Sequence, residues 1–206
     1  GGVGVAPKAE LYIRKVFEDS GNANGYRDII EAFEWCIDTY NDGITGNEIQ
    51  VISMSWGSSY SAGDPGIHPW ITTLYNLGVI LVGASGNEGL FSLPIDTVSY
   101  PARYEEVIAV GATDENNILA WFSSCGPAVE LVAPGVAVVS TYPDKSYYSM
   151  DGTSMAAPHV SGTAALVLAS KIDPSYDYDH DGLWDNNEVR KKLQMTADDL
   201  YTPGRD

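Results

Sequence analysis

Segments with the pattern of β-strands and segments with the pattern of α-helices alternate along this chain. In chain order they are a strand at 10–17, a helix at 26–40, a strand at 49–54, a helix at 69–77, and strands at 78–84 and 107–112. Helices that alternate with strands in this way cross over between strands running in the same direction. The pattern therefore predicts an α/β fold, with a mostly parallel sheet and helices on both of its faces.

The rest of the chain has a different pattern. Residues 113–150 are rich in short strands and in turn residues, and apolar residues at helical spacing follow at 154–171 and 188–195. There is no internal repeat and no low-complexity linker. A chain of 206 residues is long enough to bury a sizeable core, so we expect one domain.

The amino-acid composition disfavours some kinds of binding partner. The chain has 28 Asp and Glu residues against 11 Lys and Arg residues, a net charge of −17. A surface of this sign repels a phosphate backbone, which disfavours nucleic acid as a partner. The longest apolar run, 77–84, suits a strand buried on both faces and is too short to cross a membrane. Residues 1–7 resemble the middle of a fold, so we expect further residues upstream of them.

The chain has two cysteines, too few to indicate a redox compartment. Cys36 falls among apolar neighbours on the helix expected at 26–40. We therefore favour two buried thiols, Cys36 and Cys125, over a disulfide bond between them.

The segment 151–159, Asp-Gly-Thr-Ser-Met-Ala-Ala-Pro-His, contains the strongest candidate for a catalytic residue. Small residues bring the backbone sharply to Ser154, and a helical pattern begins there. A serine in the first turn of a helix lies at the positive end of the helix dipole, where developing negative charge is stabilised. The simpler interpretation of a lone serine in this position is a helix N-cap. The complete motif favours a nucleophile.

Residues 152–159 resemble the nucleophile segment of the subtilisin-like serine peptidases, and the resemblance extends over almost the whole chain. It implies a three-layer α/β sandwich, of which residues 1–206 form the latter part of the catalytic domain. It further implies an extracellular serine endopeptidase that cleaves polypeptides through an acyl-enzyme at Ser154.

A second candidate catalytic residue, Asn87, follows the strand expected at 78–84. Ligands in open α/β sheets bind outside the carboxyl ends of the strands, where Asn87 would lie. Taken alone, the sequence Asn-Glu-Gly is more simply a turn. Together with the Ser154 motif it resembles the oxyanion segment of the family. There the asparagine amide and the serine backbone N–H hold the oxyanion of the tetrahedral intermediate.

The resemblance also implies a substrate-binding region made of three segments. These are Ser55-Trp56-Gly57, Ala84-Ser85-Gly86 and Ser99. In the family the first segment pairs with extended substrate and lines the primary specificity pocket, and the second forms the facing wall. Trp56 replaces the usual leucine and either reshapes the neighbouring subsite or packs in the core. Ser99 stands at the pocket floor, where glycine is frequent, which implies a shallower pocket.

Residues 177–188 match the calcium-loop pattern D-x-D-x-D-G-x5-E without a mismatch. The oxygen ligands of Ca²⁺ would come from Asp177, Asp179, Asp181, the carbonyl of Leu183, Asp185 and Glu188. Gly182 permits the sharp turn, and Trp184 anchors the loop. The alternative is a solvated acidic loop, which is disfavoured because so many like charges repel one another without a cation. We expect Ca²⁺ to hold the C-terminal segment in place.

A serine nucleophile needs a histidine base and a carboxylate that orients the base. The chain has three histidines, His68, His159 and His180, and none has the Gly-Thr-His sequence context of the family. His159 lies five residues after Ser154 on the same helix, about 140° around its axis. Nor does any strand end in Asp-Thr-Gly or Asp-Ser-Gly. We therefore expect an upstream segment or a second chain to supply both groups, and this chain alone to be nearly inactive.

In the family, the strand that bears the aspartate lies between the strands matched here by 10–17 and 49–54. Without that neighbour their backbone groups would be bare, so we expect another chain to supply the strand or the sheet to rearrange. The rival interpretation of the chain is a non-catalytic module that binds calcium or peptides. Ser154 and Asn87 argue against it, because only the chemistry requires both.

Overall fold

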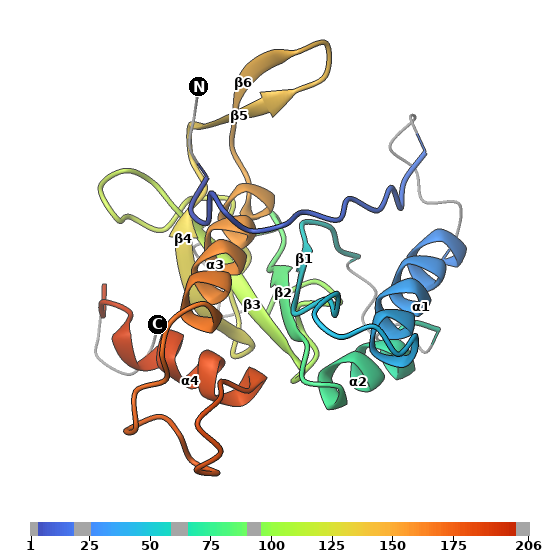
Figure 1. Ribbon diagram of the computed structural model, residues 1–206. Helices are drawn as coiled ribbons and strands as arrows, with labels where there is room; N and C mark the ends of the chain where they lie inside the picture. The colour runs from blue at the N-terminus through green and yellow to red at the C-terminus, as the bar shows by residue number, and fades with distance from the viewer. Residues whose placement is uncertain (1–3, 19–25, 59–65, 90–95, 201–206) are drawn as a thin grey trace.

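The computed structural model describes residues 4–18, 26–58, 66–89 and 96–200. The elements are α1 (Arg27–Asn41), β1 (Val51–Met54), α2 (His68–Asn76), β2 (Ile80–Ala84), β3 (Val107–Thr113), β4 (Val129–Pro134), β5 (Val138–Tyr142), β6 (Ser146–Met150), α3 (Thr153–Leu168) and α4 (Asn186–Thr196) (Figure 1). The helices expected from the sequence are confirmed with small differences at their ends. So are three of the four expected strands, which correspond to β1, β2 and β3.

The main sheet has the strand order β1-β2-β3-β4, and every neighbouring pair is parallel. Parallel strands bring their carboxyl ends to one edge of the sheet, and in open α/β folds that edge is where ligands bind. Ser55 follows β1 at this edge, and Ser85 follows β2. The sheet therefore brings the first two predicted substrate-binding segments together.

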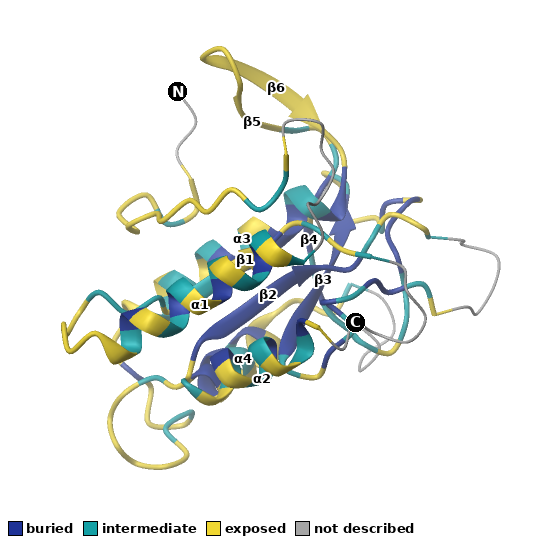
Figure 2. Cartoon of the chain, turned by 90° about the vertical axis from the view of Figure 1, so that its right-hand side faces the viewer, coloured by how far each residue is buried: buried dark blue, intermediate teal, exposed yellow. Residues whose placement is uncertain are grey.

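Each face of the sheet is covered by helices (Figures 1 and 2). Ile80, Val82 and Ala84 of β2 pack with α3 and α4 in one buried cluster. Leu81, which points the other way, belongs to a second cluster with α1 and α2. Both β2 and β3 are buried along their whole length, as expected for central strands of a parallel sheet. The predicted α/β class with helices on both faces is confirmed.

Residues 10–17 do not form the strand that the sequence predicts. The segment has no regular structure, and the side chains of Leu11 and Ile13 are 82% and 89% exposed. The segment runs to α1, where the ring of Tyr12 lies 5.6 Å from that of Trp35. A strand requires a hydrogen-bonded neighbour, and among the described residues β1 pairs only with β2. Side chains that favour strands are therefore not sufficient to form a β-strand when the backbone has no hydrogen-bonded neighbour.

The region 113–150 contributes to two separate structures. β4 extends the parallel sheet beside β3, and Leu131 and Ala133 of β4 are buried. β5 and β6 form an antiparallel hairpin that projects from the body of the molecule and is exposed along almost its whole length (Figure 2). At the base of the hairpin, the N–H of Gly152 donates to the carbonyl of Gly135 at 2.8 Å. None of the helices described is long and apolar enough to span a membrane.

The two cysteines are not joined in a disulfide bond, as expected. Cys36 is buried, as predicted, within the cluster formed by α1 and α2. Cys125 is only half-buried, so the prediction of two buried thiols is wrong for this residue. It lies in the loop before β4.

Alkylation should distinguish the two cysteines. Burial raises the pKa of the Cys36 thiol to about 11, against a smaller opposite effect of Arg14. Only the thiolate reacts, and roughly one Cys36 in a thousand would be ionised at pH 8. In the folded protein iodoacetamide should therefore modify Cys125 first, and the rate at Cys36 should keep rising with pH up to about 11. Timed labelling followed by mass spectrometry measures both rates. Equal rates at pH 8 in the native protein would contradict the prediction.

Candidate active site

Ser154 lies in the first turn of α3, two residues after a glycine with unusual backbone geometry. Gly152 has φ 154° and ψ 156°, a combination that essentially only glycine adopts. This turn directs the chain from the β5–β6 hairpin into α3. In the first turn of a helix the backbone N–H groups have no partner within the helix, so the N–H of Ser154 is available to a ligand.

Two reciprocal hydrogen bonds join Ser154 to the end of β1. The Ser154 Oγ donates to the carbonyl of Ser55 at 3.0 Å, and the Ser55 Oγ donates to the carbonyl of Ser154 at 2.8 Å. The two residues are separated by 99 positions in the sequence. Their contact holds the candidate nucleophile against the segment that the sequence predicts to bind substrate.

The side-chain amide of Asn87 has an orientation that its partners determine. Its Oδ1 accepts hydrogen bonds from both the backbone N–H and the Oγ1 of Thr153, each at 3.0 Å. A backbone N–H can only donate, so the amide oxygen has to face Thr153. The amide NH₂ group of Asn87 is therefore directed away from Thr153 and remains available as a donor.

The two donors expected for an oxyanion hole converge beside Gly152. A Cβ atom on Gly152 would lie 3.6 Å from Nδ2 of Asn87 and 3.7 Å from the backbone N of Ser154. The Sδ of Met155 would lie 3.5 Å from the same Cβ, and because glycine has no Cβ the position itself is free for a small third group. A carbonyl oxygen that gains negative charge is the kind of group that two such N–H donors stabilise.

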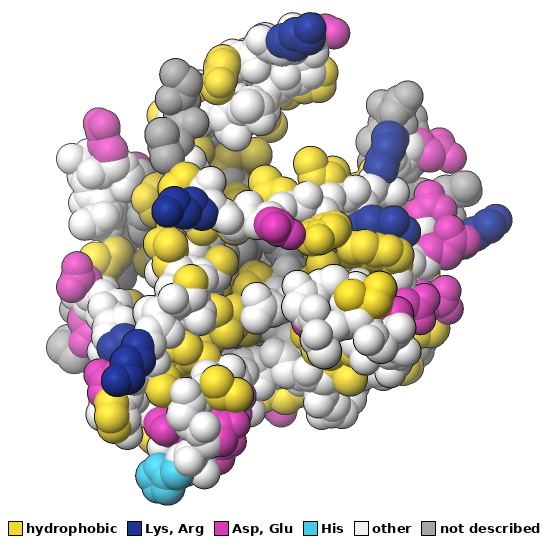
Figure 3. Space-filling model, in the orientation of Figure 1, with side chains coloured by type: hydrophobic (Ala, Val, Ile, Leu, Met, Phe, Trp, Pro, Cys, Tyr) yellow, Lys and Arg dark blue, Asp and Glu magenta, His cyan; other side chains and the backbone are white. Residues whose placement is uncertain are grey.

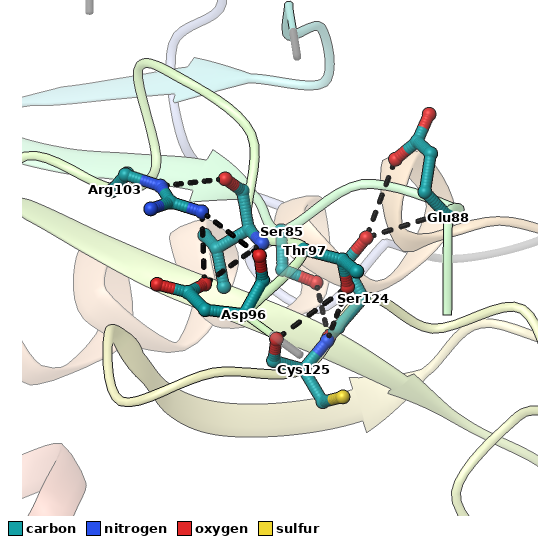
Figure 4. Close-up of polar contacts among 8 residues, drawn as sticks. Ser85, Glu88, Asp96, Thr97, Arg103, Ser124 and Cys125 are labelled. Atoms are coloured by element: carbon teal, nitrogen blue, oxygen red, sulfur yellow. Dashed lines mark hydrogen bonds and ion pairs between the residues drawn. The ribbon is translucent and has the colours of Figure 1, made fainter. Parts of the chain in front are cut away.

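A network of hydrogen bonds centred on Glu88 supports Asn87, and Figure 4 shows the part of it between Glu88 and Ser124. The carboxylate of Glu88 accepts from the backbone N–H of Asn87 at 2.9 Å and from the Oγ of Ser124 at 3.3 Å. The Oγ of Ser124 in turn accepts from the backbone N–H of Glu88 at 3.2 Å. Sequence reasoning did not identify Ser124 or Thr153 as supports. Thr153 stood beside the candidate nucleophile within the motif, whereas Ser124 carried no local signal.

Ser99 is buried between the two segments predicted to form the walls of the specificity pocket. Its backbone N–H donates to the carbonyl of Ser85 at 2.8 Å, and it is 4% exposed. On the other side, a Cβ on Gly57 would lie 3.0 Å from the Cβ of Ser99. A Cβ on Gly86 would lie 2.7 Å from the Oγ of Ser99. The three predicted segments are therefore adjacent, and both wall glycines are needed for this close packing.

The segment that carries Ser99 is held by its own polar contacts (Figure 4). The Arg103 guanidinium donates to the carbonyl of Val98 at 2.8 Å and to the carboxylate of Asp96 at 2.9 Å. The backbones of Thr97 and Cys125 are joined by a hydrogen bond of 2.9 Å. These contacts hold the backbone on the N-terminal side of Ser99.

Trp56 packs toward the apolar core. It is half-buried against the cluster of α1 and α2, and its ring meets that of Phe17 edge-on with 6.3 Å between centroids. This arrangement agrees with the core-packing alternative for Trp56. Its effect on a substrate subsite stays a prediction.

Each of the three histidines has a location away from Ser154. The ring of His159 is hydrogen-bonded through Nδ1 to the carbonyl of Met155 at 2.8 Å. His68 begins α2 and contacts the carboxylate of Glu106 at 3.2 Å. His180 is exposed within the acidic loop. In the described structure none of these three rings is hydrogen-bonded to Ser154, whose Oγ donates instead to the carbonyl of Ser55.

The acidic loop 177–188 lies between α3 and α4. The carboxylates of Asp177, Asp179 and Glu188 converge, with ligand atoms all within 4.8 Å of one another. Asp181 instead accepts the N–H of Leu183 at 2.7 Å, whose own side chain is exposed. Asp185 caps α4 by accepting the N–H of Glu188 at 2.7 Å. The loop thus brings together three of the six residues predicted as calcium ligands.

The chain matches a known protein family along its whole length. The family model of the subtilase family matches residues 1–206. Similar proteins include Subtilisin DY from Bacillus licheniformis, 40% identical over 200 residues, and Subtilisin Savinase from Lederbergia lenta, 41% identical over 200 residues. A Thermostable alkaline protease from Halalkalibacterium halodurans is 40% identical over 203 residues.

These alignments cover 97% to 98% of this chain. They cover 65% of each of the two subtilisins and 49% of the alkaline protease, so the chain spans less than two thirds of the length of these relatives. The residues matched by the family model nevertheless include the whole parallel sheet and both Asn87 and Ser154. The chain belongs to the subtilase family of serine proteases.

Proposed function

We propose that this chain carries the nucleophile and the oxyanion hole of a serine endopeptidase. In this proposal Ser154 attacks the scissile carbonyl, and the amide of Asn87 and the N–H of Ser154 stabilise the resulting oxyanion. The observation that supports it best is the convergence of these two donors beside Gly152. An ordinary N-cap serine would not need a second donor aimed at the same space.

The proposed substrate is an extended polypeptide. The backbone after β1, at Ser55 and Gly57, is exposed and lies beside Ser154, where it can pair with the substrate backbone. The side chain next to the scissile bond would enter between the walls of the pocket, above Ser99. As the resemblance implies, we propose that the protease acts outside the cell.

The base that activates Ser154 has to come from outside these 206 residues. Within them Ser154 Oγ donates to a backbone carbonyl, which cannot remove its proton. In the described sheet, the edge of β1 away from β2 is unpaired. A strand added there would bring its side chains beside Ser55 and Ser154. We propose that an upstream segment or a second polypeptide adds this strand and supplies the histidine and the aspartate.

A fluorophosphonate probe tests the proposal, because it reacts rapidly only with a serine whose proton a base removes. The 206-residue chain alone should react no faster than an ordinary serine. The same chain joined to the residues encoded upstream of it, or mixed with a partner polypeptide that carries the base, should be labelled at Ser154. Peptide mapping locates the label.

The alternative is a non-catalytic module with the same fold. It would be favoured if the upstream residues, and any polypeptide that co-purifies, lacked both the His-Gly-Thr-His and the Asp-Thr/Ser-Gly sequences. It would also be favoured if the complete protein failed to label at Ser154.

A further inference from the structure

A group of carboxylates lies far from Ser154 and has no part in the proposed chemistry. Asp177, Asp179 and Glu188 approach one another so closely that one ligand atom from each falls within 4.8 Å of the others. Figure 3 shows acidic side chains gathered at the bottom of the molecule, where the loop 177–188 turns. Like charges at this separation repel strongly unless a cation lies between them.

One of these carboxylates, and one oxygen of another, are removed from water. Glu188 is 2% exposed, and the Oδ1 atom of Asp177 is buried without any hydrogen-bond partner. Among the described residues, no Lys or Arg forms an ion pair with either side chain; the neighbouring Lys192 pairs with Asp173 instead. A buried carboxylate oxygen without a donor or a cation is costly. No positively charged side chain of the described residues therefore compensates these carboxylates at the place where they converge.

We propose that the loop 177–188 binds one Ca²⁺ ion at this point. Asp177, Asp179 and Glu188 would form the centre of the ligand set, completed by the oxygens of Asp181, Leu183 and Asp185. All are hard oxygen ligands, which Ca²⁺ prefers in sets of six to eight. Gly182 has φ 78° at the sixth position of the loop, where a calcium loop of this kind turns sharply.

The same residues fasten α4 to the rest of the fold. The Glu188 carboxylate accepts the N–H of Tyr178 at 2.7 Å and that of Asp185 at 3.1 Å. It thereby completes the capping box at the start of α4. The next residues, Val189 at 0% exposure and Leu193 at 7%, lie in the core cluster beneath α3. An ion bound to Glu188 would therefore stabilise the packing of α4 on the sheet.

Two further contacts tie the loop to neighbouring elements. The indole N–H of Trp184 donates to the carbonyl of Ser170, after α3, at 3.1 Å. The amide of Asn186 donates to the carbonyl of Tyr75, near the end of α2, at 2.8 Å. The contact to α2 lies at the amino end of β2, whereas Ser154 lies at the carboxyl ends of the strands. The ion would thus act on stability and leave the geometry around Ser154 unchanged.

Terbium luminescence tests the site directly in the purified chain. Tb³⁺ substitutes for Ca²⁺, and Trp184 is inside the loop, so excitation of tryptophan should produce Tb³⁺ emission that added Ca²⁺ suppresses. Trp184→Phe should lose most of the emission and keep the thermal stabilisation by Ca²⁺. At a hundredfold excess over Kd, Ca²⁺ should raise Tm by about 5–10 °C relative to the chelator-treated protein.

Asp177→Asn is the variant that distinguishes a specific Ca²⁺ site from a diffuse acidic surface. It removes a ligand charge, and because the buried Oδ1 of Asp177 has no hydrogen-bond partner to lose, the variant should fold. It should weaken Ca²⁺ binding by about tenfold or more. Asp198→Asn makes the same change in net charge at an exposed position beyond α4 and should leave binding unchanged.

The proposal is wrong if the two variants weaken Ca²⁺ binding equally, since that result indicates only a diffuse acidic surface. It is also wrong if Mg²⁺ at the same concentration raises Tm as much as Ca²⁺, or if a chelator leaves Tm unmoved. None of these readouts depends on peptidase activity, so the site can fail independently of the proposed function.

Discussion

Replacing Ser154 with alanine should reduce kcat for peptide hydrolysis by about a millionfold in the complete protease, meaning this chain together with the residues that supply its base. The magnitude is the one known for the nucleophile of subtilisin itself and is taken over from that relative. The physical reason is that no acyl-enzyme can form without the hydroxyl. The remaining rate would come from the oxyanion donors and from substrate binding alone.

The matched control for this prediction is Ser170→Ala. Ser170 is an exposed serine just after α3, and its Oγ donates only to the carbonyl of Val167. This variant should retain full activity. Ser154→Ala should also keep its Tm within a few degrees, because Ser154 is half-buried and its Oγ makes one hydrogen bond, to the carbonyl of Ser55. Substantial hydrolysis by Ser154→Ala would show that the nucleophile is elsewhere.

Replacing Asn87 with alanine should reduce kcat by about 100- to 1,000-fold and change KM little. This range is likewise the one known for the corresponding donor in subtilisin. The asparagine amide interacts with charge that develops only in the transition state, so its loss affects the rate more than substrate binding. Steady-state kinetics on a peptide substrate separates kcat from KM.

Asn87 has two tasks in the structure, and a second variant distinguishes them. Its Oδ1 holds Thr153, and its NH₂ group faces the oxyanion space. Asn87→Asp keeps an acceptor for Thr153 but lacks the donor, so it should be at least as impaired as Asn87→Ala. Recovery of activity in Asn87→Asp would mean that the residue only positions Thr153. Asn116→Ala, an exposed asparagine in the loop after β3, should behave as the unaltered protein.

Much of the fold was predictable because its signals are local. The alternation of strand and helix patterns predicted the parallel sheet, and the apolar run 77–84 predicted its buried central strand β2. The prediction from sequence failed where the structure of a segment depends on a partner far away in the chain. Residues 10–17 have strand-forming side chains and yet remain irregular, because in the described structure they are not hydrogen-bonded to any strand. β4 was not recognised as part of the sheet because its short apolar pattern stood among turns.

The candidate site likewise has some features that local sequence predicts and others that depend on distant contacts. The sequence by itself determined that Ser154 begins a helix after a sharp glycine turn and that residues 177–188 concentrate carboxylates at calcium-loop spacing. Only the tertiary structure decided the contacts between distant residues. Ser55 meets Ser154 across 99 positions, Thr153 orients Asn87 across 66, and Ser124 supports Glu88 across 36. The physical reason is that periodicity and motifs report on neighbours along the chain. The direction of an amide or the loss of water from a carboxylate depends instead on which elements pack together.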